Sequence, residues 1–195
     1  VARMGEIALK SLNAAMSAIN NKSLEDIETV AKCEKKLDDM QEALTEFLIK
    51  VDNLSLSENQ KKHINNLFNM VTDIERVGDH ADNLSENAKY IIDNDLEFSD
   101  LGKEDLAEIS KDSIEAFEIA LNARSGDALR AVRKVNKLED EVDMLEDEMR
   151  EKHIERLSKG DCNPQAGIAF LDIISNLERV SDHATNIAGY VKNEI

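Results

Sequence analysis

Apolar residues recur along most of this chain at alternating intervals of three and four positions, which is the spacing of one face of an α-helix. One such run begins with Val30, Cys33, Leu37 and Met40. The residues between runs are mostly Asn, Ser, Gly and Asp, which favour turns. The pattern predicts an all-α protein with six helices, at residues 2–20, 23–53, 57–93, 103–124, 127–158 and 164–193.

Recognisable turn signals separate the predicted helices. The stretch Ser57–Gln60 has the spacing of a capping box, which starts a helix. Gly160 is suited to end a helix, and Asn163 followed by Pro164 is suited to begin the next one. Short connections place consecutive helices antiparallel. We therefore expect two pseudo-symmetric three-helix bundles with up-down-up topology, formed by residues 1–98 and 99–195.

One stretch of the chain occurs twice. Residues 73–83 read DIERVGDHADN and residues 176–186 read NLERVSDHATN. Glu, Arg, Val, Asp, His, Ala and Asn recur in the same register, 103 positions apart. A self-match at a fixed separation indicates that the architecture itself is repeated. The repeat therefore predicts two similar halves, each ending in a helix that carries the duplicated polar residues.

The apolar runs determine which helix face the duplicated polar residues occupy. With Ile74 and Val77 in the core, Glu75 and Asp79 fall on the opposite face, one helical turn apart. The second helix of each half carries a further Glu-x-x-x-Asp pair. Carboxylates and an amide together form an oxygen-rich surface that suits Mg, Ca, Mn or Fe ions, or Zn with help from His. The predicted metal ligands are Glu34, Asp38, Glu75, Asp79, Asn83, Glu139, Asp143, Glu178, Asp182 and Asn186.

A different interpretation of the acidic residues is also open. An acidic stripe opposite an apolar stripe is what any solvated helix presents, and the chain is then a structural interaction bundle without a metal. Against it, the stripe sets like charges one turn apart, which costs roughly a few tenths of a kcal/mol per pair. A bound cation would turn that repulsion into attraction and lower the pKa of the carboxylates.

Other members of the duplicated stretch have simpler interpretations. We expect Arg76 and Arg179 to form salt bridges with acids on a neighbouring helix, with anion binding as the alternative. His80 and His183 fall beside the apolar seam, so we expect packed, hydrogen-bonded side chains, with auxiliary metal ligation as the alternative. Gly78 is expected to allow the close approach of another helix.

Composition narrows the classes of function. A net charge of −17 disfavours binding to nucleic acid or to anionic lipid, and favours cations or a basic protein partner. Cys33 and Cys162 do not form a disulfide framework, which fits a reducing compartment. No apolar run approaches the ~20 residues of a membrane span. The phosphate loops, zinc spacings and nucleophile elbows of common enzymes are missing from the sequence, so we predict that the chain is not an enzyme.

At this point the sequence resembles a known family. The Glu-Arg-Val-Gly-Asp-His-Ala-Asp-Asn stretch and its second copy are similar to the paired signature of PhoU-type domains. Three further stretches resemble, more specifically, the cytoplasmic PhoU-like domain of sodium/phosphate cotransporters: 55–60, 153–157 and 160–172. Two positions depart from the pattern: Ser181 replaces the usual Gly, and Gly189 is expected to interrupt the last turn of the final helix. These departures would make the second half bind metal differently or leave it without metal.

The resemblance implies a fold, a cofactor and a role. The fold would be two pseudo-symmetric bundles, with multinuclear metal clusters, iron or zinc among them, on the Glu-x-x-x-Asp residues. The role would be control of phosphate transport or of phosphate-dependent signalling. The partner would be a membrane transporter domain, upstream of Val1 or on a separate protein, which places this chain in the cytoplasm at the inner face of the membrane. The alternatives are a free-standing PhoU-type regulator and the metal-free bundle; a homodimer is also open.

Overall fold

The structure, a computed structural model, describes residues 1–125, 127–160 and 162–192. Over these ranges the chain is all-α, as the apolar spacing predicts. The described residues form six α-helices and one 3₁₀ turn: α1 Ala2–Asn21, α2 Leu24–Asp52, α3 Glu58–Asp93, α4 Asp100–Asn122, η1 Ala123–Ser125, α5 Ala128–Lys159 and α6 Pro164–Lys192. No described helix is both long and apolar enough to cross a lipid bilayer.

The predicted helix ends are mostly confirmed by their caps. Ser57 and Gln60 form both hydrogen bonds of the capping box at the start of α3. Gly160 ends α5 in the left-handed conformation (φ 76°), which glycine adopts without strain. Asn163 Oδ1 accepts a hydrogen bond from the backbone N–H of Gln165 (2.8 Å) and so caps α6. Gly126, Asp161 and residues 193–195 of the predicted turns and last helix lie outside the described residues.

Two predicted details of the helices are wrong. The fourth helix begins at Asp100 rather than at residue 103, because the Ser99 hydroxyl accepts a hydrogen bond from Gly102 N (3.2 Å) and starts the helix earlier. Gly189 does not interrupt the last helix, since α6 continues through it to Lys192. A single glycine costs a helix only about 1 kcal/mol, which the packing of α6 outweighs.

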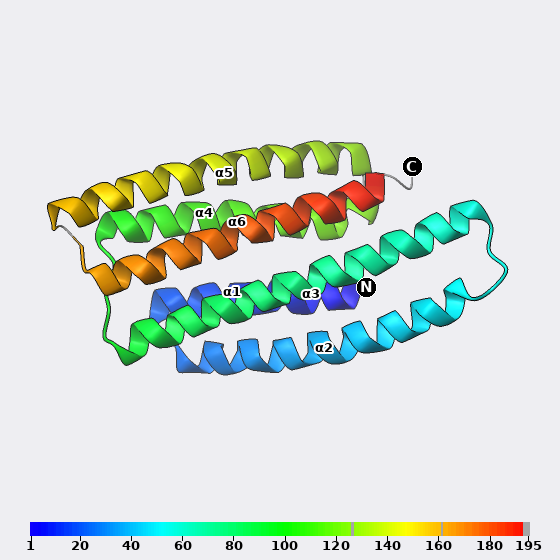
Figure 1. The fold of residues 1–195 in the computed structure, drawn as a ribbon, viewed down its shortest axis with the longest axis horizontal. Helices are drawn as coiled ribbons and strands as arrows, with labels where there is room; N and C mark the ends of the chain where they lie inside the picture. Colours follow the sequence, from blue (N-terminus) through cyan, green and yellow to red (C-terminus); the bar gives the residue numbers. More distant parts are fainter. Residues whose placement is uncertain (126, 161, 193–195) are drawn as a thin grey trace.

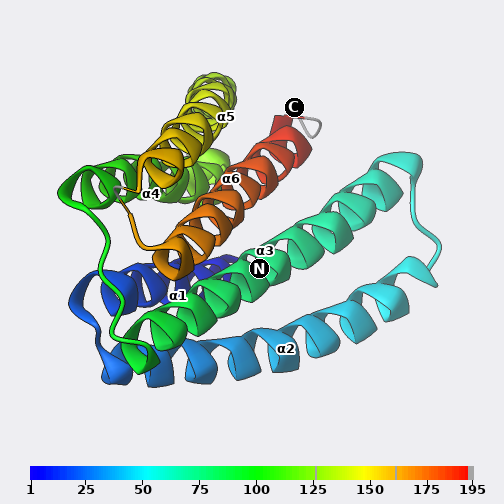
Figure 2. The same ribbon diagram turned by 60° about the vertical axis from the view of Figure 1, so that its left-hand side comes forward.

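The helices pack as two groups of three that meet along α3 and α6. Helices α1, α2 and α3 contact one another, and α4 and α5 both contact α6. Helices α3 and α6 lie side by side and antiparallel through the middle of the molecule, with α2 and α5 on the outside (Figure 1 and Figure 2). Helices α1 and α4 also touch across the junction. The expected pair of pseudo-symmetric three-helix bundles is present.

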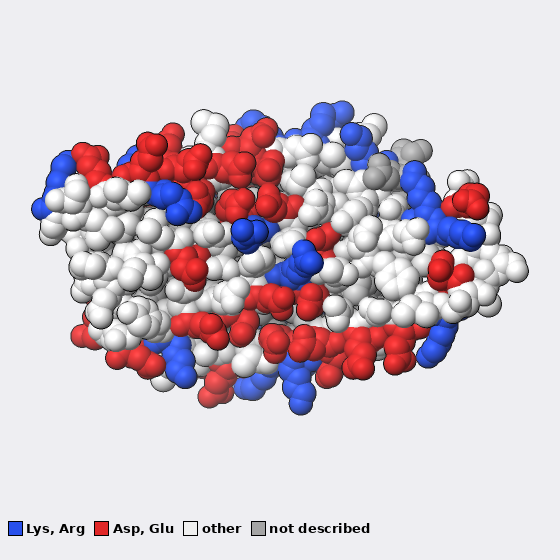
Figure 3. Space-filling view, in the orientation of Figure 1, with Lys and Arg blue, Asp and Glu red and all other residues white. Residues whose placement is uncertain are grey.

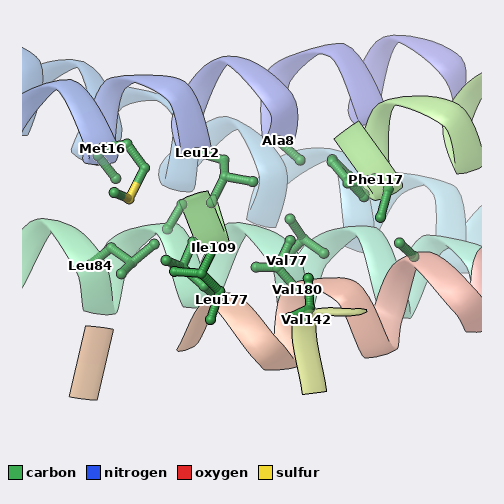
Figure 4. Close-up of a cluster of buried hydrophobic side chains, with 14 of the residues drawn as sticks. Ala8, Leu12, Met16, Val77, Leu84, Ile109, Phe117, Val142, Leu177 and Val180 are labelled. Carbon is green, nitrogen blue, oxygen red and sulfur yellow. The ribbon is translucent and has the colours of Figure 1, made fainter. Parts of the chain in front are cut away.

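One hydrophobic core runs through both groups of helices. Figure 4 shows Leu12 of α1, Val77 of α3, Phe117 of α4 and Leu177 of α6 in one cluster of buried side chains. Buried apolar surface is the main stabilising contribution in a chain of this size. Because the core is continuous, the division into domains at residue 98 stays a prediction. The junction itself places α3 and α6, which carry the two copies of the duplicated stretch, against each other.

Candidate functional site

The duplicated acidic residues form two patches, one in each group of helices. We define the first acidic patch as Glu34 and Asp38 of α2 with Glu75 and Asp79 of α3, and the second as Glu139 and Asp143 of α5 with Glu178 and Asp182 of α6. The glutamates are half-buried in both patches. On the face shown in Figure 3, acidic side chains gather in two bands, one over α5 and α6 and one along α2 and α3.

Glycine explains how α2 and α3 come close enough to form the first acidic patch. A Cβ atom added to Gly78 would overlap the Cδ1 atom of Leu37 on α2. Gly78 is itself buried, and Leu37 is 1% exposed. The prediction that Gly78 permits a close helix approach is therefore confirmed. The acids one position or one turn away on the same two helices are drawn together by that contact.

The carboxylates of the first acidic patch are held in an unfavourable electrostatic environment. Burial raises the pKa of Glu75, and the charges of Asp79 and Asp38 raise it further. Burial also raises the pKa of Glu34, with Asp38 as the next cause. The pKa of Asp79 is raised by burial, although His80 opposes the shift. Carboxylates from two helices thus lie close enough to repel one another.

In the second acidic patch, one carboxylate has a large pKa shift. Burial raises the pKa of Glu178 to about 7, and the charge of Asp182 adds to the shift. Burial followed by Asp143 raises the pKa of Glu139, and burial followed by Asp182 raises that of Asp143.

The oxygen donors suit a cation, but they are not assembled around one. In the described part of the chain, no three His, Cys, Asp or Glu side chains converge closely enough to hold a metal ion as they stand. Carboxylate oxygens with raised pKa values nonetheless match the chemistry of a hard or borderline cation. A metal would need these side chains to close around it, and the assignment of metal ligands stays a prediction.

The two copies of the duplicated stretch face each other across a groove between α3 and α6. The groove has a volume of about 660 Å³. It is lined by Arg76, Asp79, His80 and Asn83 of the first copy and by Arg179, Asp182, His183 and Asn186 of the second, with Glu139 and Thr185. The expectation that the duplicated polar residues lie on the helix face opposite the core is therefore incomplete. Because α3 packs on α6, part of each outward face is turned toward the other half.

Hydrogen bonds join the two copies reciprocally. The Nδ1–H of His80 donates to Asn176 Oδ1 (2.9 Å), and the Nδ1–H of His183 donates to Asp73 Oδ1 (2.8 Å). The two imidazole rings are stacked, with centroids 5.5 Å apart. Tyr190 donates its hydroxyl proton to Asp73 Oδ2 (2.8 Å). The interpretation of both histidines as packed, hydrogen-bonded side chains is confirmed.

The first residue of each copy was missed as a functional position. Asp73 and Asn176 are buried, 6% and 8% exposed, and each accepts from the histidine of the other copy. In the sequence, the two residues occupy matching positions of the two copies, directly before the apolar seam, but they are of different types. Both predicted asparagine ligands, Asn83 and Asn186, are exposed, and Asn83 also donates to Asn176 Oδ1 (3.2 Å).

The expected salt bridges of the two duplicated arginines are wrong. Within the described residues, neither Arg76 nor Arg179 lies within 4.0 Å of a carboxylate oxygen, and both are exposed along the groove. Their charges still act at longer range, because Arg76 opposes the raised pKa of Glu75 and Arg179 that of Glu178. An exposed ion pair gains little in water, so nothing fixes these long side chains on one partner.

A comparison with known protein families finds the same duplication. The family model described as "PhoU domain" matches residues 1–88 and again residues 104–191, one match for each group of helices. A phosphate-specific transport system accessory protein PhoU homolog 1 from Thermotoga maritima is 24% identical over 192 residues, which cover 96% of this chain and 80% of that protein. A homolog of the same description from Clostridium acetobutylicum is 26% identical over 193 residues, covering 95% and 84%.

Solved structures share the fold. PhoU from Pseudomonas aeruginosa superposes with a TM-score of 0.90 at 20% identity, covering 98% of this chain and 91% of the other. The phosphate transport system regulatory protein PhoU from Streptococcus pneumoniae gives a TM-score of 0.84 at 19% identity, covering 99% and 90%. None of these four proteins is described as a cotransporter domain, so that finer resemblance stays a prediction. The family model matches both halves of this chain, and the two matches together cover most of the chain's length. The chain therefore belongs to the PhoU domain family.

Proposed function

We propose that this chain is a regulatory accessory protein of phosphate transport that acts on a separate transporter protein. Two relatives named as phosphate-specific transport system accessory proteins match this chain over 95–96% of its length, which supports this role. A free-standing regulator is therefore better supported than the cytoplasmic domain of a cotransporter. The sequence alone favoured the cotransporter domain. A cytoplasmic location at the inner face of the membrane belongs to the same proposal, and so does the absence of an enzymatic role.

The regulatory role has a direct test in cells. Phosphate uptake is measured in cells that lack the gene, in cells that carry it, and in cells with the two acidic patches substituted. We expect uptake, or its response to external phosphate, to change on deletion and to be restored by the wild-type chain. Unchanged uptake under both high and low phosphate would contradict the proposal.

We further propose that the acidic patches bind divalent or transition-metal cations, with iron or zinc as the leading candidates. The observation that carries this proposal is uncompensated charge. None of the eight patch carboxylates forms an ion pair with Lys or Arg among the described residues. They instead raise one another's pKa across neighbouring helices. A cation would offset this repulsion and hold α2 on α3 and α5 on α6.

Metal analysis of chelator-free, untagged protein tests this second proposal. We expect Glu75→Ala/Asp79→Ala to remove metal from the first acidic patch and Glu178→Ala/Asp182→Ala from the second. Glu104→Ala/Glu108→Ala is the matched control, because these two exposed acids have the same spacing on α4. A ligand at one hundred times its Kd stabilises the folded state by about 2.7 kcal/mol, so the melting temperature should rise with metal. If neither the metal content nor the melting temperature changes in either double variant, the metal-free bundle is favoured.

A further inference from the structure

A second pocket lies away from the acidic patches, at the end of the molecule where α5 turns into α6 (Figure 1). Its volume is about 240 Å³, which is smaller than most sites for drug-sized molecules. Its walls come from the connection between α3 and α4, the last turns of α5 and the first turns of α6. No residue of the acidic patches or of the groove between α3 and α6 contributes to it.

A buried histidine forms part of the wall of this pocket, and one of its ring nitrogens has no hydrogen-bond partner in the described part of the chain. His153 is 4% exposed, and its Nε2 atom has no partner among the described residues. The ring is stacked on Phe170, with centroids 5.0 Å apart and an interplanar angle of 21°. A Cβ atom on Gly167 would overlap Nε2, so the glycine makes room for the nitrogen. Buried polar atoms are paired in the great majority of cases, so an unpaired one indicates a missing partner.

An arginine with free donors stands beside the histidine. Arg156 donates one hydrogen bond from Nη1 to Asp105 Oδ2 (3.2 Å), and its buried Nε has no partner among the described residues. Its guanidinium carbon lies 5.7 Å from the centre of the Phe170 ring. The side chain is 15% exposed and lines the pocket. A guanidinium has five N–H donors and no acceptor, so the remaining donors call for an acceptor such as an anion.

The ends of two helices add partial positive charge at this pocket. Helices α4 and α6 both begin at the pocket, and the N-terminus of a helix carries partial positive charge. Their first amides are largely taken by Ser99 and Asn163, so the helices contribute field rather than free donors. Among the described residues that line the pocket, the one acid is Glu97, and it is paired with Lys22 at 2.7 Å and with Lys103 at 3.4 Å.

We propose that this pocket binds a small oxyanion of the phosphate and sulfate class, with Arg156 as its main ligand and His153 as a second donor. A tetrahedral oxyanion offers the acceptors that both side chains lack, and guanidinium groups bind such ions through paired hydrogen bonds. Burial and the charge of Arg156 lower the pKa of His153, so the imidazole is neutral and donates one proton. The oxyanion is either a free inorganic ion or the phosphoryl group of a larger molecule.

Binding is measured by calorimetric titration of the whole chain with inorganic phosphate, at constant ionic strength and with a chelator present. The chelator removes metal from the acidic patches, so the result does not depend on the proposed metal binding. We expect saturable binding of one ion, weakened at least tenfold by Arg156→Gln, which removes a charge-assisted bond. Arg133→Gln is the matched control, an exposed arginine on the same helix that does not line the pocket, and should not change the affinity.

A native cysteine supplies a second measurement that requires no substitution. Cys162 lines the pocket and is half-buried, whereas Cys33 is buried on α2. Phosphate should therefore slow alkylation of Cys162, in a saturable way, relative to chloride at the same ionic strength. This measurement decides the question even if Arg156→Gln fails to fold.

A phosphate monoester distinguishes the two sources of the ion. Binding of inorganic phosphate alone identifies a free ion, and binding of both probes through Arg156 identifies a phosphoryl group. The proposal is overturned if neither probe binds, if binding is unaffected by Arg156→Gln, or if Cys162 is not protected. Loss of phosphate binding together with unchanged metal content would separate this site from the acidic patches.

Discussion

The first and second acidic patches carry the same four carboxylates in the same register, yet they differ in what surrounds them. In the first, Gly78 lets Leu37 pack directly on α3, and in the second the matching residue is the buried Ser181. The second patch also lies near Glu146, which is only 8% exposed and contributes to the raised pKa of Glu178. Duplication kept the acids while the neighbours diverged. The two patches should therefore differ in cation affinity and in their response to pH.

The largest expected difference between the halves is in the stability that is lost when one of the reciprocal hydrogen bonds is removed. Asp73→Ala leaves the Nδ1–H of His183 and the hydroxyl of Tyr190 without their buried acceptor. Breaking a buried, charge-assisted pair costs about 3 kcal/mol in free energy of unfolding. Asn176→Ala at the matching position removes neutral hydrogen bonds and should cost about half as much. Urea unfolding at pH 7 measures both values.

Asp73→Asn is the control for shape, and it should recover only about half of the stability lost in Asp73→Ala, because it restores an acceptor but not the charge. Tyr190 gives an independent optical readout of the same contact. Burial and the hydrogen bond to Asp73 raise the pKa of Tyr190 to about 12, so Asp73→Ala should lower the pH at which this tyrosine ionises. Equal destabilisation by Asp73→Ala and Asn176→Ala would show that the charge of Asp73 contributes nothing.

The next difference concerns the small residues of the duplicated stretch. Gly78→Ser forces Leu37 off its position, and overpacking of this kind costs about 1–2 kcal/mol. Ser181→Gly should cost about 0.5 kcal/mol, chiefly through the lower helix propensity of glycine. Thermal unfolding without metal measures the stability, and metal analysis shows whether the first acidic patch has opened. If Gly78→Ser proves neutral, α2 and α3 do not depend on this close contact.

The helices and the composition of each patch could be predicted because both depend on local periodicity. A seam such as Val30, Cys33 and Leu37 identifies the core face of its own helix, and the acids then fall opposite it. Caps extended this accuracy to most helix ends. The exception is the start of α4, which is capped by Ser99. It was not predicted, because many Ser residues do not precede a helix and nothing in the sequence distinguishes Ser99 from them.

What could not be predicted depends on how one half is rotated against the other. The packing of α3 on α6 brings His80 to Asn176 and leaves Arg76 without an ion pair in the described chain. No spacing within either helix encodes that rotation, since it is set by the summed fit of two apolar faces far apart in sequence. The pocket beside Arg156, proposed to bind an oxyanion, is likewise assembled from three separate segments.

The smallest difference expected is electrostatic, and it depends on pH. The folded-state pKa of Glu178, about 7, lies above its ordinary value of 4.5. The folded chain therefore binds this proton more tightly than the unfolded chain, so stability from this group falls as pH rises from about 4.5 to 7. Glu178→Gln mimics the protonated form and should stabilise the chelated protein at pH 8. After allowance for solvent screening of a half-exposed group, the gain is about 1 kcal/mol.

Glu75→Gln tests the comparison between the patches, because the pKa of Glu75 is also raised by burial and by Asp79. We expect the same sign as for Glu178→Gln and a smaller gain at pH 8, and both gains should vanish below pH 5. Urea unfolding at the two pH values measures them. Adding zinc or iron should reverse the sign, since a cation stabilises the ionised carboxylate and the glutamine cannot replace it. A gain at Glu75 that equals or exceeds the gain at Glu178 would mean that the two patches are electrostatically equivalent, despite their different neighbours.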